Sequence, residues 1–286
     1  MSNLNIYFVG LSKNCFQTLK YNLDFINLLI KHGLKEVKII IVDSDSTDGT
    51  KELCRSLEYE NLIFIEEDNL NQKFQNRIEI LAYCRNKGLQ TIDKTKDSLY
   101  IPMDLDIDLF SFIEPQNFVN LINNFLNDEN LDALFPFSDP YYYDIFALRK
   151  MGWVNKNEVL VAHKLKQKFK IGSFFFNYFY VFNKQVTKNY FSEDMINVQS
   201  AFGGIGFYKI FKNKDYLYET ESTDTEFYSE HLSFNKNFNN LFIDKNWTVP
   251  APSEHIHFHL LSRLGKIIYI LKTFKYDILS FLNKRT

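Results

Sequence analysis

The 286-residue sequence predicts an α/β domain built on a mostly parallel sheet flanked by helices. Short apolar strands alternate with helical segments in the first 110 residues, and short polar loops join them. The segment at residues 37–42 is a continuous, β-branched apolar run, which is typical of a strand buried on both faces. In such sheets ligands bind beyond the carboxyl ends of the strands, and two acidic segments of this sequence fall there.

Four strands are expected in this first part of the chain, at residues 4–9, 37–42, 62–65 and 98–103. Helices are expected at residues 16–31 and 77–89, and a further helix begins near Lys51. In the first helix, apolar residues recur at spacings of three or four and form one stripe: Leu19, Leu23, Ile26 and Ile30. Gly33 marks the end of that helix.

The rest of the sequence has weaker helical patterning and is rich in aromatic clusters, such as residues 141–143 and 174–176. We expect residues 111–259 to close over the sheet rather than to form an independent domain. In residues 260–286, apolar residues recur every three or four positions, and basic residues oppose a single acid, Asp277. This pattern predicts a basic amphipathic helix, which would either lie on an anionic membrane surface or dock on the domain.

Composition excludes several classes of protein. Hydrophobic residues make up 45% of the chain and aromatic residues 17%, which excludes a disordered chain. A net charge of −2 argues against nucleic acid as a partner. No signal-peptide pattern is present, and no apolar run reaches the roughly 18 residues of a spanning helix. Three widely spaced cysteines indicate reduced thiols, and so a cytoplasmic protein: Cys15, Cys54 and Cys84.

The apolar run at residues 98–103 leads into three carboxylates at alternate positions, Asp104, Asp106 and Asp108. If the segment stays extended, the three side chains share one face. Carboxylates this close repel one another, and burying them unpaired is costly. A divalent cation relieves both problems, and Mn²⁺ or Mg²⁺ also binds phosphates. The segment therefore predicts a metal–diphosphate site at a strand end, with a polar turn as the alternative.

A second polar loop, residues 43–50, follows the buried strand at residues 37–42. It offers Asp43, Asp45 and Ser46 directly before a helix. Such a loop can hold the base and ribose hydroxyls of a nucleotide. The alternative is an ordinary helix cap with turn residues, because Ser, Thr and Asp are favoured there in any case.

Several motifs resemble those of a known family. Residues 41–50, Ile-Val-Asp-Ser-Asp-Ser-Thr-Asp-Gly-Thr, followed by Asp104-Leu105-Asp106, resemble the nucleotide-sugar half of a GT-A glycosyltransferase. Residues 77–86, Arg-Ile-Glu-Ile-Leu-Ala-Tyr-Cys-Arg-Asn, resemble a helix of the fungal capsule-associated α-1,3-mannosyltransferase family. Further segments are similar to that family in the same order, at residues 143–149, 198–206 and 229–231. The sequence departs from the family pattern at Phe146, where the family has Trp. It also departs at residues 202–204, where Phe-Gly-Gly replaces Trp-Asn-Gly.

The resemblance implies a metal-dependent glycosyltransferase of GT-A fold. Its donor would be a GDP- or UDP-linked hexose, with mannose implied by the named family, and its acceptor a hydroxyl on a glycan or glycolipid. It further implies retention of configuration. Synthesis of a surface polysaccharide or lipo-oligosaccharide is the natural setting, and the basic C-terminal helix would suit a place on the inner face of the membrane. Residues 1–110 would bind the nucleotide sugar and residues 111–259 the acceptor. The residues themselves leave open an inverting transferase, a nucleotidyltransferase and a non-catalytic sugar- or membrane-binding module.

The expected metal ligands are Asp104 and Asp106, with His257 as a third. His257 is the middle of three alternating histidines that share one face if residues 255–259 are extended. The resemblance favours one of them, because GT-A enzymes often add a late His to the metal site; a three-His zinc site is the alternative. The expected donor-binding residues are Asp43, Asp45, Ser46, Arg77, Arg85 and Asp104.

Glu230 and His231 are the candidate catalytic pair. In an inverting enzyme Glu230 would be the general base for the acceptor hydroxyl, whereas in a retaining enzyme it would orient the acceptor or stabilise charge at the anomeric carbon. The alternative is a helix N-cap or an ion pair with a lysine. Acceptor contacts are expected from an aromatic and polar segment and from two glycines that let the backbone approach a sugar closely: Tyr143, Asp144, Arg149, Gly203 and Gly204.

Overall fold

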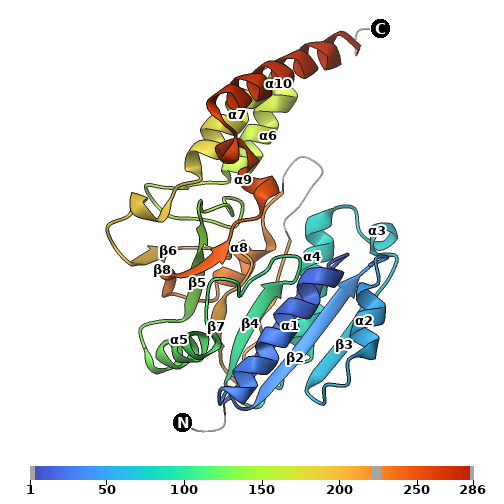
Figure 1. Ribbon diagram of the computed structural model, residues 1–286, viewed down its shortest axis with the longest axis vertical. Coiled ribbons are helices and arrows are strands. Elements are labelled where there is room, and N and C mark those ends of the chain that lie inside the picture. The colour runs from blue at the N-terminus through green and yellow to red at the C-terminus, as the bar shows by residue number, and fades with distance from the viewer. Residues whose placement is uncertain (1–3, 221–226, 284–286) are drawn as a thin grey trace.

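A continuous mixed sheet of eight strands forms the centre of the protein (Figure 1). The computed structural model describes residues 4–220 and 227–283. Across the described sheet the strand order is β3-β2-β1-β4-β7-β5-β8-β6. The strands are β1 (Asn5–Ser12), β2 (Val37–Ser44), β3 (Leu62–Glu67), β4 (Ser98–Asp104), β5 (Ala133–Asp139), β6 (Met195–Val198), β7 (Phe207–Ile210) and β8 (Leu241–Pro250).

The sheet joins the two halves of the sequence. β3, β2, β1 and β4 run parallel, as the strand–helix alternation predicts. β7 is antiparallel to both β4 and β5, and so links the first four strands to the last ones. β5 pairs with β8 in parallel, and β6 completes the edge in the antiparallel sense. The predicted α/β fold with a mostly parallel sheet is confirmed.

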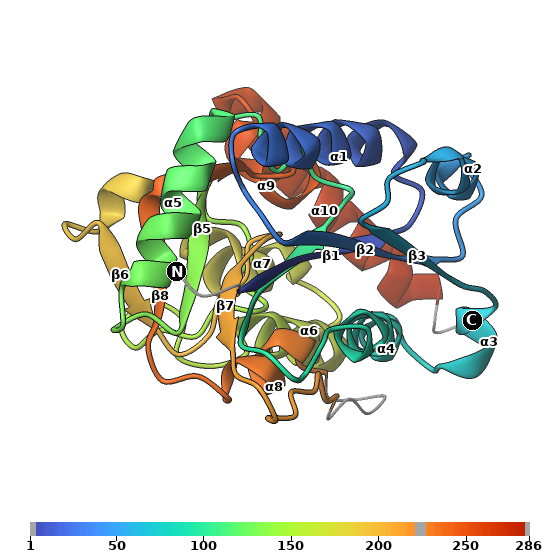
Figure 2. The same ribbon diagram turned by 90° about the horizontal axis from the view of Figure 1, so that it is seen from below.

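Helices cover both faces of this sheet (Figure 2). One face carries α1 (Phe16–Lys31), α2 (Thr50–Ser56) and α5 (Pro115–Asn127). The other carries α4 (Arg77–Gln90) and α8 (Glu230–Asn235), and the short α3 (Leu70–Lys73) precedes α4. Successive residues of β1 enter opposite cores, with Phe8 on the α1 side and Val9 on the α4 side. The apolar strands are therefore buried on both faces, which explains why their sequences do not alternate.

Most predicted elements of the first half are confirmed. The helix at residues 16–31 has the expected bounds, and α2 begins one residue before the expected Lys51. The strands are longer than their apolar runs: β1 reaches Ser12 and β2 reaches Ser44. The parallel register continues past the apolar residues, where Ser12 lies beside Asp43 and Leu11 beside Asp104. The polar ends of three adjacent strands are thereby brought to one edge.

Three helices stand together at one end of the molecule, beyond the sheet (Figure 1). They are α6 (Glu158–Phe169), α7 (Ser173–Tyr180) and α10 (Arg263–Asn283), and we call them the protruding helices. The predicted amphipathic helix at residues 260–286 corresponds to α10, although it begins at Arg263 and residues 284–286 lie outside the described part. Two short 3₁₀ helices, Phe182–Lys184 and Lys188–Tyr190, follow α7.

The prediction of an extended histidine segment is wrong. Residues 255–259 lie in the helix α9 (Ser253–Leu260), which joins β8 to α10. Ile256 and Phe258 are both buried although they alternate with histidines. Phe258 packs against Phe174 and Phe182. The three imidazoles consequently do not share one face.

Candidate active site

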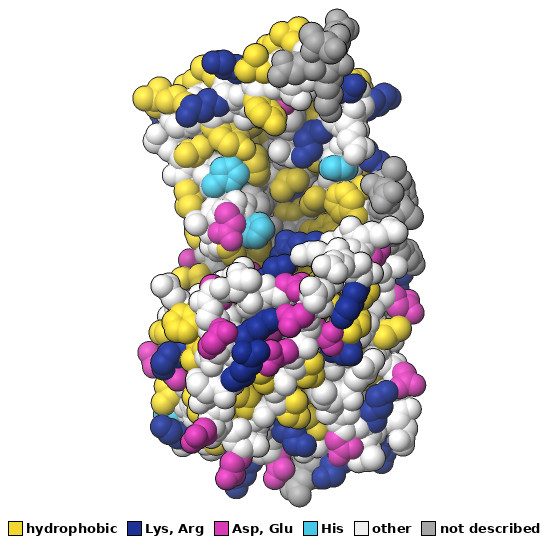
Figure 3. Space-filling model, turned by 90° about the vertical axis from the view of Figure 1, so that its right-hand side faces the viewer, with side chains coloured by type: hydrophobic (Ala, Val, Ile, Leu, Met, Phe, Trp, Pro, Cys, Tyr) yellow, Lys and Arg dark blue, Asp and Glu magenta, His cyan; other side chains and the backbone are white. Residues whose placement is uncertain are grey.

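A cavity of about 1100 Å³ opens at the carboxyl ends of β1 and β4. Figure 3 shows it as a hollow between the protruding helices and the rest of the molecule, with charged side chains and histidines around it. The predicted site residues that line it are Arg77, Arg85, Asp104, Asp106, Tyr143, Asp144, Glu230, His231 and His257. Six other predicted site residues are not part of this lining: Asp43, Asp45, Ser46, Arg149, Gly203 and Gly204.

The chain turns directly after Asp104, the last residue of β4, and we call residues 104–106, which carry two of the expected metal ligands, the metal turn. β4 ends at Asp104, so the expectation that Asp104, Asp106 and Asp108 share one strand face is wrong. The turn forms because the Leu105 amide donates to the Leu11 carbonyl (3.0 Å) and the Leu105 side chain is completely buried. Only a glycine fits beneath it, since a Cβ at Gly10 would lie 2.4 Å from Leu105 Cδ1. Asp104 and Asp106 therefore both face the cavity, whereas Asp108 does not line it.

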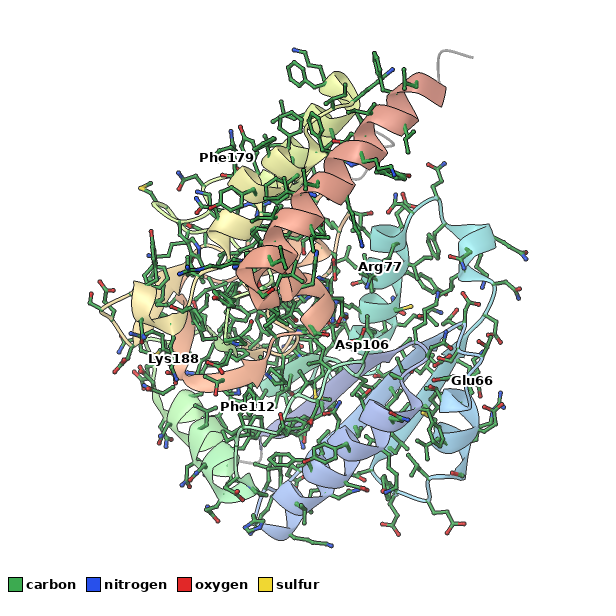
Figure 4. The ribbon with its side chains drawn as sticks, turned by 45° about the horizontal axis from the view of Figure 1, so that its top comes forward. Glu66, Arg77, Asp106, Phe112, Phe179 and Lys188 are labelled. Atoms are coloured by element: carbon green, nitrogen blue, oxygen red, sulfur yellow. The ribbon has the colours of Figure 1, made fainter. Side chains whose placement is uncertain are left out.

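The two cavity carboxylates fit a divalent cation. Asp106 is open to the cavity, yet burial between the cavity walls and then the charge of Asp104 raise its pKa. Arg77, in the first turn of α4, lies on the same side of the cavity and opposes this shift (Figure 4). A cation would relieve the repulsion, and Mg²⁺ and Mn²⁺ commonly take one or two carboxylates together with substrate phosphates and water. Asp104 and Asp106 are therefore suitable ligands.

The third expected ligand stays a prediction. His257 lines the cavity from α9, and its Nδ1 lies 3.0 Å from the carbonyl oxygen of Glu254. Within residues 4–220 and 227–283, no three His, Cys, Asp or Glu side chains are gathered closely enough to hold a metal ion. A site built on Asp104 and Asp106 would thus depend on the phosphates of a bound donor for further ligands.

A buried arginine joins the metal turn to the predicted catalytic glutamate. Arg85 is 2% exposed; its Nη2 donates to Asp104 Oδ1 (2.8 Å) and its Nε to Glu230 Oε1 (2.9 Å). Burial opposes the charge on Arg85, but Asp104 and Glu230 outweigh it and raise its pKa well above the ordinary value. The Phe202 ring lies 4.7 Å from the guanidinium carbon and covers one side of it. Arg85 therefore holds the two acids and does not itself reach into the cavity as a free cation.

His231 is a buried, neutral imidazole next to this cluster. It is 2% exposed and stacks on Phe202, with ring centroids 3.7 Å apart. Burial and then the charge of Arg85 lower its pKa well below the ordinary value. Neither ring nitrogen has a hydrogen-bond partner among the described residues, although Nε2 lies 3.5 Å from Glu230 Oε1. His231 lines the cavity, but both of its ring nitrogens are buried.

The loop after β2 is held by bonds within the protein. Asp43 is completely buried and accepts hydrogen bonds from the hydroxyls of Ser12 (2.9 Å) and Ser46 (2.5 Å). Asp45 accepts from the amides of Asn69 (2.6 Å) and Leu70 (3.1 Å) at the start of α3. These bonds hold the loop in place but do not cap α2, whose N-cap residue Gly49 has no side-chain cap bond. Ser44, the last residue of β2, lines the cavity.

Of the predicted acceptor residues, Tyr143 and Asp144 line the cavity, whereas Arg149 does not. Asp144 accepts from the amides of Ala147 (3.2 Å) and Gly203 (3.0 Å), and Tyr143 stacks on His255 at 5.2 Å between ring centroids. Arg149 instead bonds the carbonyl oxygens of Phe146 (3.2 Å) and Leu148 (2.5 Å), outside the cavity.

Gly204 closes the metal turn from the acceptor side. It has a φ of +92°, and its carbonyl accepts from the Asp104 amide (2.8 Å). A Cβ there would lie 3.0 Å from Ile107 and 3.2 Å from the Tyr143 hydroxyl. The two glycines therefore serve the backbone: Gly203 holds Asp144, and Gly204 holds Asp104.

Three residues of the cavity were not among the site residues expected from the sequence, although residues 10–14 offer a thin version of a nucleotidyltransferase phosphate loop. Phe202 contacts both Arg85 and His231, and its place beside the glycine segment was the available signal. Lys13 and Asn14, after β1, also line the cavity. The Asn14 side chain accepts from the Thr47 amide (2.8 Å) and so joins the loops that follow β1 and β2. A short polar run after the first strand is a signal for such a loop, although it does not indicate which side chains face a ligand.

Comparison with known proteins agrees with this geometry. The family model described as Cryptococcal mannosyltransferase 1 matches residues 5–242. The chain belongs to this family. The resemblance noted from the motifs is confirmed, because the match covers both the metal turn and the segment of Glu230. No curated protein sequence matches the chain.

Part of the chain is similar to solved glycosyltransferase structures, at low TM-scores. A mannosyltransferase from Pyrobaculum calidifontis, in complex with GDP-Man and Mn²⁺, is 18% identical over 48% of this chain and 36% of its own, with a TM-score of 0.37. Mannosyl-3-phosphoglycerate synthase from Rubrobacter xylanophilus is 17% identical over 47% of this chain and 41% of its own, with a TM-score of 0.34. Glucosyl-3-phosphoglycerate synthase from Mycobacterium tuberculosis, in complex with Mg²⁺ and UDP, is 19% identical over 48% of this chain and 45% of its own, with a TM-score of 0.34. The chain thus spans less than half the length of these proteins.

Proposed function

We propose that this protein is a metal-dependent glycosyltransferase that moves a hexose from a nucleotide diphosphate sugar to a hydroxyl of a glycan or glycolipid. The observation that carries the proposal is the pairing of Asp104 and Asp106 in one cavity with Arg77 beside them. This charge pattern suits a cation bound to a diphosphate. The family membership favours mannose, carried by GDP or UDP.

The donor end of the cavity has a defined chemical task. Asp104 and Asp106 would hold Mn²⁺ or Mg²⁺, which offsets the charge that develops on the departing nucleoside diphosphate. Arg77 is exposed at the cavity wall and has the reach and charge to bind a phosphate oxygen. Arg85 keeps Asp104 in position through its hydrogen bond at 2.8 Å. Ser44, the last residue of β2, lines the cavity and is placed to bond a nucleotide hydroxyl.

The acceptor end favours a retaining reaction. Glu230 is 3% exposed and bonded to Arg85, so it is poorly suited to take a proton from an acceptor hydroxyl. A retaining transfer needs no such base, because the departing phosphate can accept the proton. The neutral ring of His231 would then form part of the cavity wall against which the acceptor is held. Tyr143 and His255 offer a stacked aromatic wall on which a sugar ring can pack.

The setting that suits this activity is the synthesis of a surface polysaccharide or lipo-oligosaccharide at the cytoplasmic face of a membrane. An inverting transferase with Glu230 as base is the nearest alternative. A nucleotidyltransferase is a second one, since Lys13 lies in the cavity after the first strand. It would release pyrophosphate from a nucleoside triphosphate, whereas the proposed reaction releases a nucleoside diphosphate.

The first test is a thermal-shift panel of GDP-, UDP- and CMP-sugars, each with Mn²⁺ and with EDTA. A ligand that binds the folded state raises the melting temperature by mass action. We expect one donor class to raise it with Mn²⁺, and the increase to vanish with EDTA and in Asp106→Ala. The matched control is Asp108→Asn, because Asp108 lies two residues away but does not line the cavity. A panel without any metal-dependent shift would contradict the proposal and favour a non-catalytic binding module.

A further inference from the structure

The protruding helices are held together by specific polar and apolar contacts. Asp277 of α10 is 6% exposed and accepts hydrogen bonds from the amides of Gly172 and Ser173, both at 2.8 Å. It also accepts from the Ser173 hydroxyl (2.7 Å), so one carboxylate caps the first turn of α7. A small core of Phe174 and Phe258, with Tyr269 packed against it, lies between α7, α9 and α10. One side of α10 is therefore docked on the domain.

The outward sides of the same helices stay apolar and exposed. On α10, Leu264 is 66% exposed and Leu271 is 64% exposed. Phe179 of α7 is 57% exposed and points away from the sheet (Figure 4). Further large exposed apolar side chains of α7 and α10 are Phe175, Tyr178, Ile267, Ile268, Phe274, Ile278, Leu279 and Leu282. The upper part of Figure 3 shows apolar and basic side chains side by side there. An exposed apolar surface of this extent marks an interaction site.

The charges around this surface all have one sign. Residues 158–180 and 260–283 contain two acids, and neither is exposed: Glu158 is buried, and the Asp277 carboxylate is turned inward to cap α7. The basic residues of these ranges are Lys164, Lys166, Lys168, Lys170, Arg263, Lys266, Lys272 and Lys275. The surface therefore combines apolar side chains with positive charge, while the whole chain has a net charge of −2. Its partner must offer an apolar layer and negative charge together.

We propose that the outward faces of α7 and α10 dock the protein on an anionic membrane surface. Phospholipid headgroups supply the negative charge, and the acyl boundary takes up the apolar side chains of an interfacial helix. A second copy of the chain fits less well, because it would bring two basic surfaces together. Of the helices in the described ranges, none is long and apolar enough to cross a bilayer.

Docking here would place the reaction cavity at the membrane. Asn177 of α7 and Tyr269 of α10 line the cavity, so the helices that expose the apolar surface also form part of its wall. An acceptor anchored in the bilayer by a lipid could then extend its sugar into the cavity without leaving the membrane. This consequence rests on the proposed function, whereas the docking itself does not.

The test is flotation with vesicles of pure phosphatidylcholine and with vesicles of equimolar phosphatidylcholine and phosphatidylglycerol. We expect binding only to the anionic vesicles, weakening as salt is added. Lys272→Gln with Lys275→Gln should lower the partition coefficient about 30-fold, from roughly fivefold per lysine at the surface. Leu264 and Leu271 lie seven positions apart, on one face of α10. Replacing both with Glu puts negative charge into the apolar surface, so this variant should not bind.

Matched control variants distinguish loss of the apolar, basic surface of α7 and α10 from general effects of substitution. Phe112→Glu with Met151→Glu changes two exposed apolar residues outside the protruding helices, and Lys35→Gln with Lys96→Gln removes two exposed lysines elsewhere. These variants should float like the wild type. Equal flotation of the α10 variants, or a dimer in light scattering that Leu264→Glu with Leu271→Glu dissociates, would overturn the proposal. The donor-induced thermal shift should persist in every variant, so failure of docking is distinguishable from failure of the proposed function.

Discussion

Replacing Arg85 with Met tests whether the buried arginine organises the site. Met has a similar length and no charge, so it can occupy the space beside Phe202 and Tyr218 without a steric clash. The substitution removes the hydrogen bonds to Asp104 Oδ1 (2.8 Å) and Glu230 Oε1 (2.9 Å). It leaves the carboxylate of Glu230 buried opposite an apolar side chain.

The expected loss can be estimated from the burial of each partner. The side chain of Asp104 is 30% exposed and can be solvated, so it contributes little, whereas that of Glu230 is 4% exposed. Leaving a buried charge without its partner typically costs about 3–5 kcal/mol. We therefore expect Arg85→Met to lower the free energy of unfolding by about 3–5 kcal/mol. Adding Glu230→Gln removes the uncompensated charge, so the double variant should be more stable than Arg85→Met alone.

Urea unfolding followed by circular dichroism measures all four corners of this double-mutant cycle. Glu230→Gln alone is the necessary control, since it leaves Arg85 paired with Asp104. The reasoning would be refuted by a loss of less than about 1 kcal/mol in Arg85→Met, the level of an exposed ion pair. A double variant no more stable than Arg85→Met would refute it equally.

Two further predictions concern the metal turn. Because burial and Asp104 raise the pKa of Asp106, this carboxyl takes up a proton at a higher pH than an ordinary aspartate. The Mn²⁺-dependent thermal shift caused by the donor should therefore weaken on acidification before ordinary carboxylates titrate, whereas the same protonation stabilises the metal-free fold. A pH series of melting temperatures with Mn²⁺ and with EDTA checks both signs. A melting temperature that falls equally in Mn²⁺ and in EDTA would contradict the assignment. Gly10→Ala should destabilise the fold by about 1–3 kcal/mol through overpacking, because the added Cβ lies 2.4 Å from Leu105 Cδ1. It should also weaken the donor shift by displacing the turn, with Gly265→Ala as a control whose added Cβ comes no closer than 3.3 Å to another atom.

Local sequence patterns were sufficient for the framework of the fold. The stripe of Leu19, Leu23 and Ile26 predicted α1 with its observed bounds, since the helical period places these residues on one face. Asp104 and Asp106 were also found from the sequence, because carboxylates that follow an apolar run must lie at a strand end. The alternating pattern misled where it was short, since five residues of α9 fit a strand and a helix equally well. It also misled at Asp108, because the chain turns directly after Asp104.

The sequence by itself determined the alternation of strands and helices, the acidic strand ends and the family, because each depends on residues that are close along the chain. Tertiary structure alone decided that Arg85 binds Glu230, which is 145 positions away, and that Leu105 closes over Gly10. It also decided that the one acid of α10 turns inward to cap α7. These contacts depend on burial and on the approach of distant segments, and neither leaves a periodic signal in the sequence. Because Arg85 bonds Asp104 as well as Glu230, the contact that makes Arg85 costly to replace also holds the Asp104 carboxylate at the cavity.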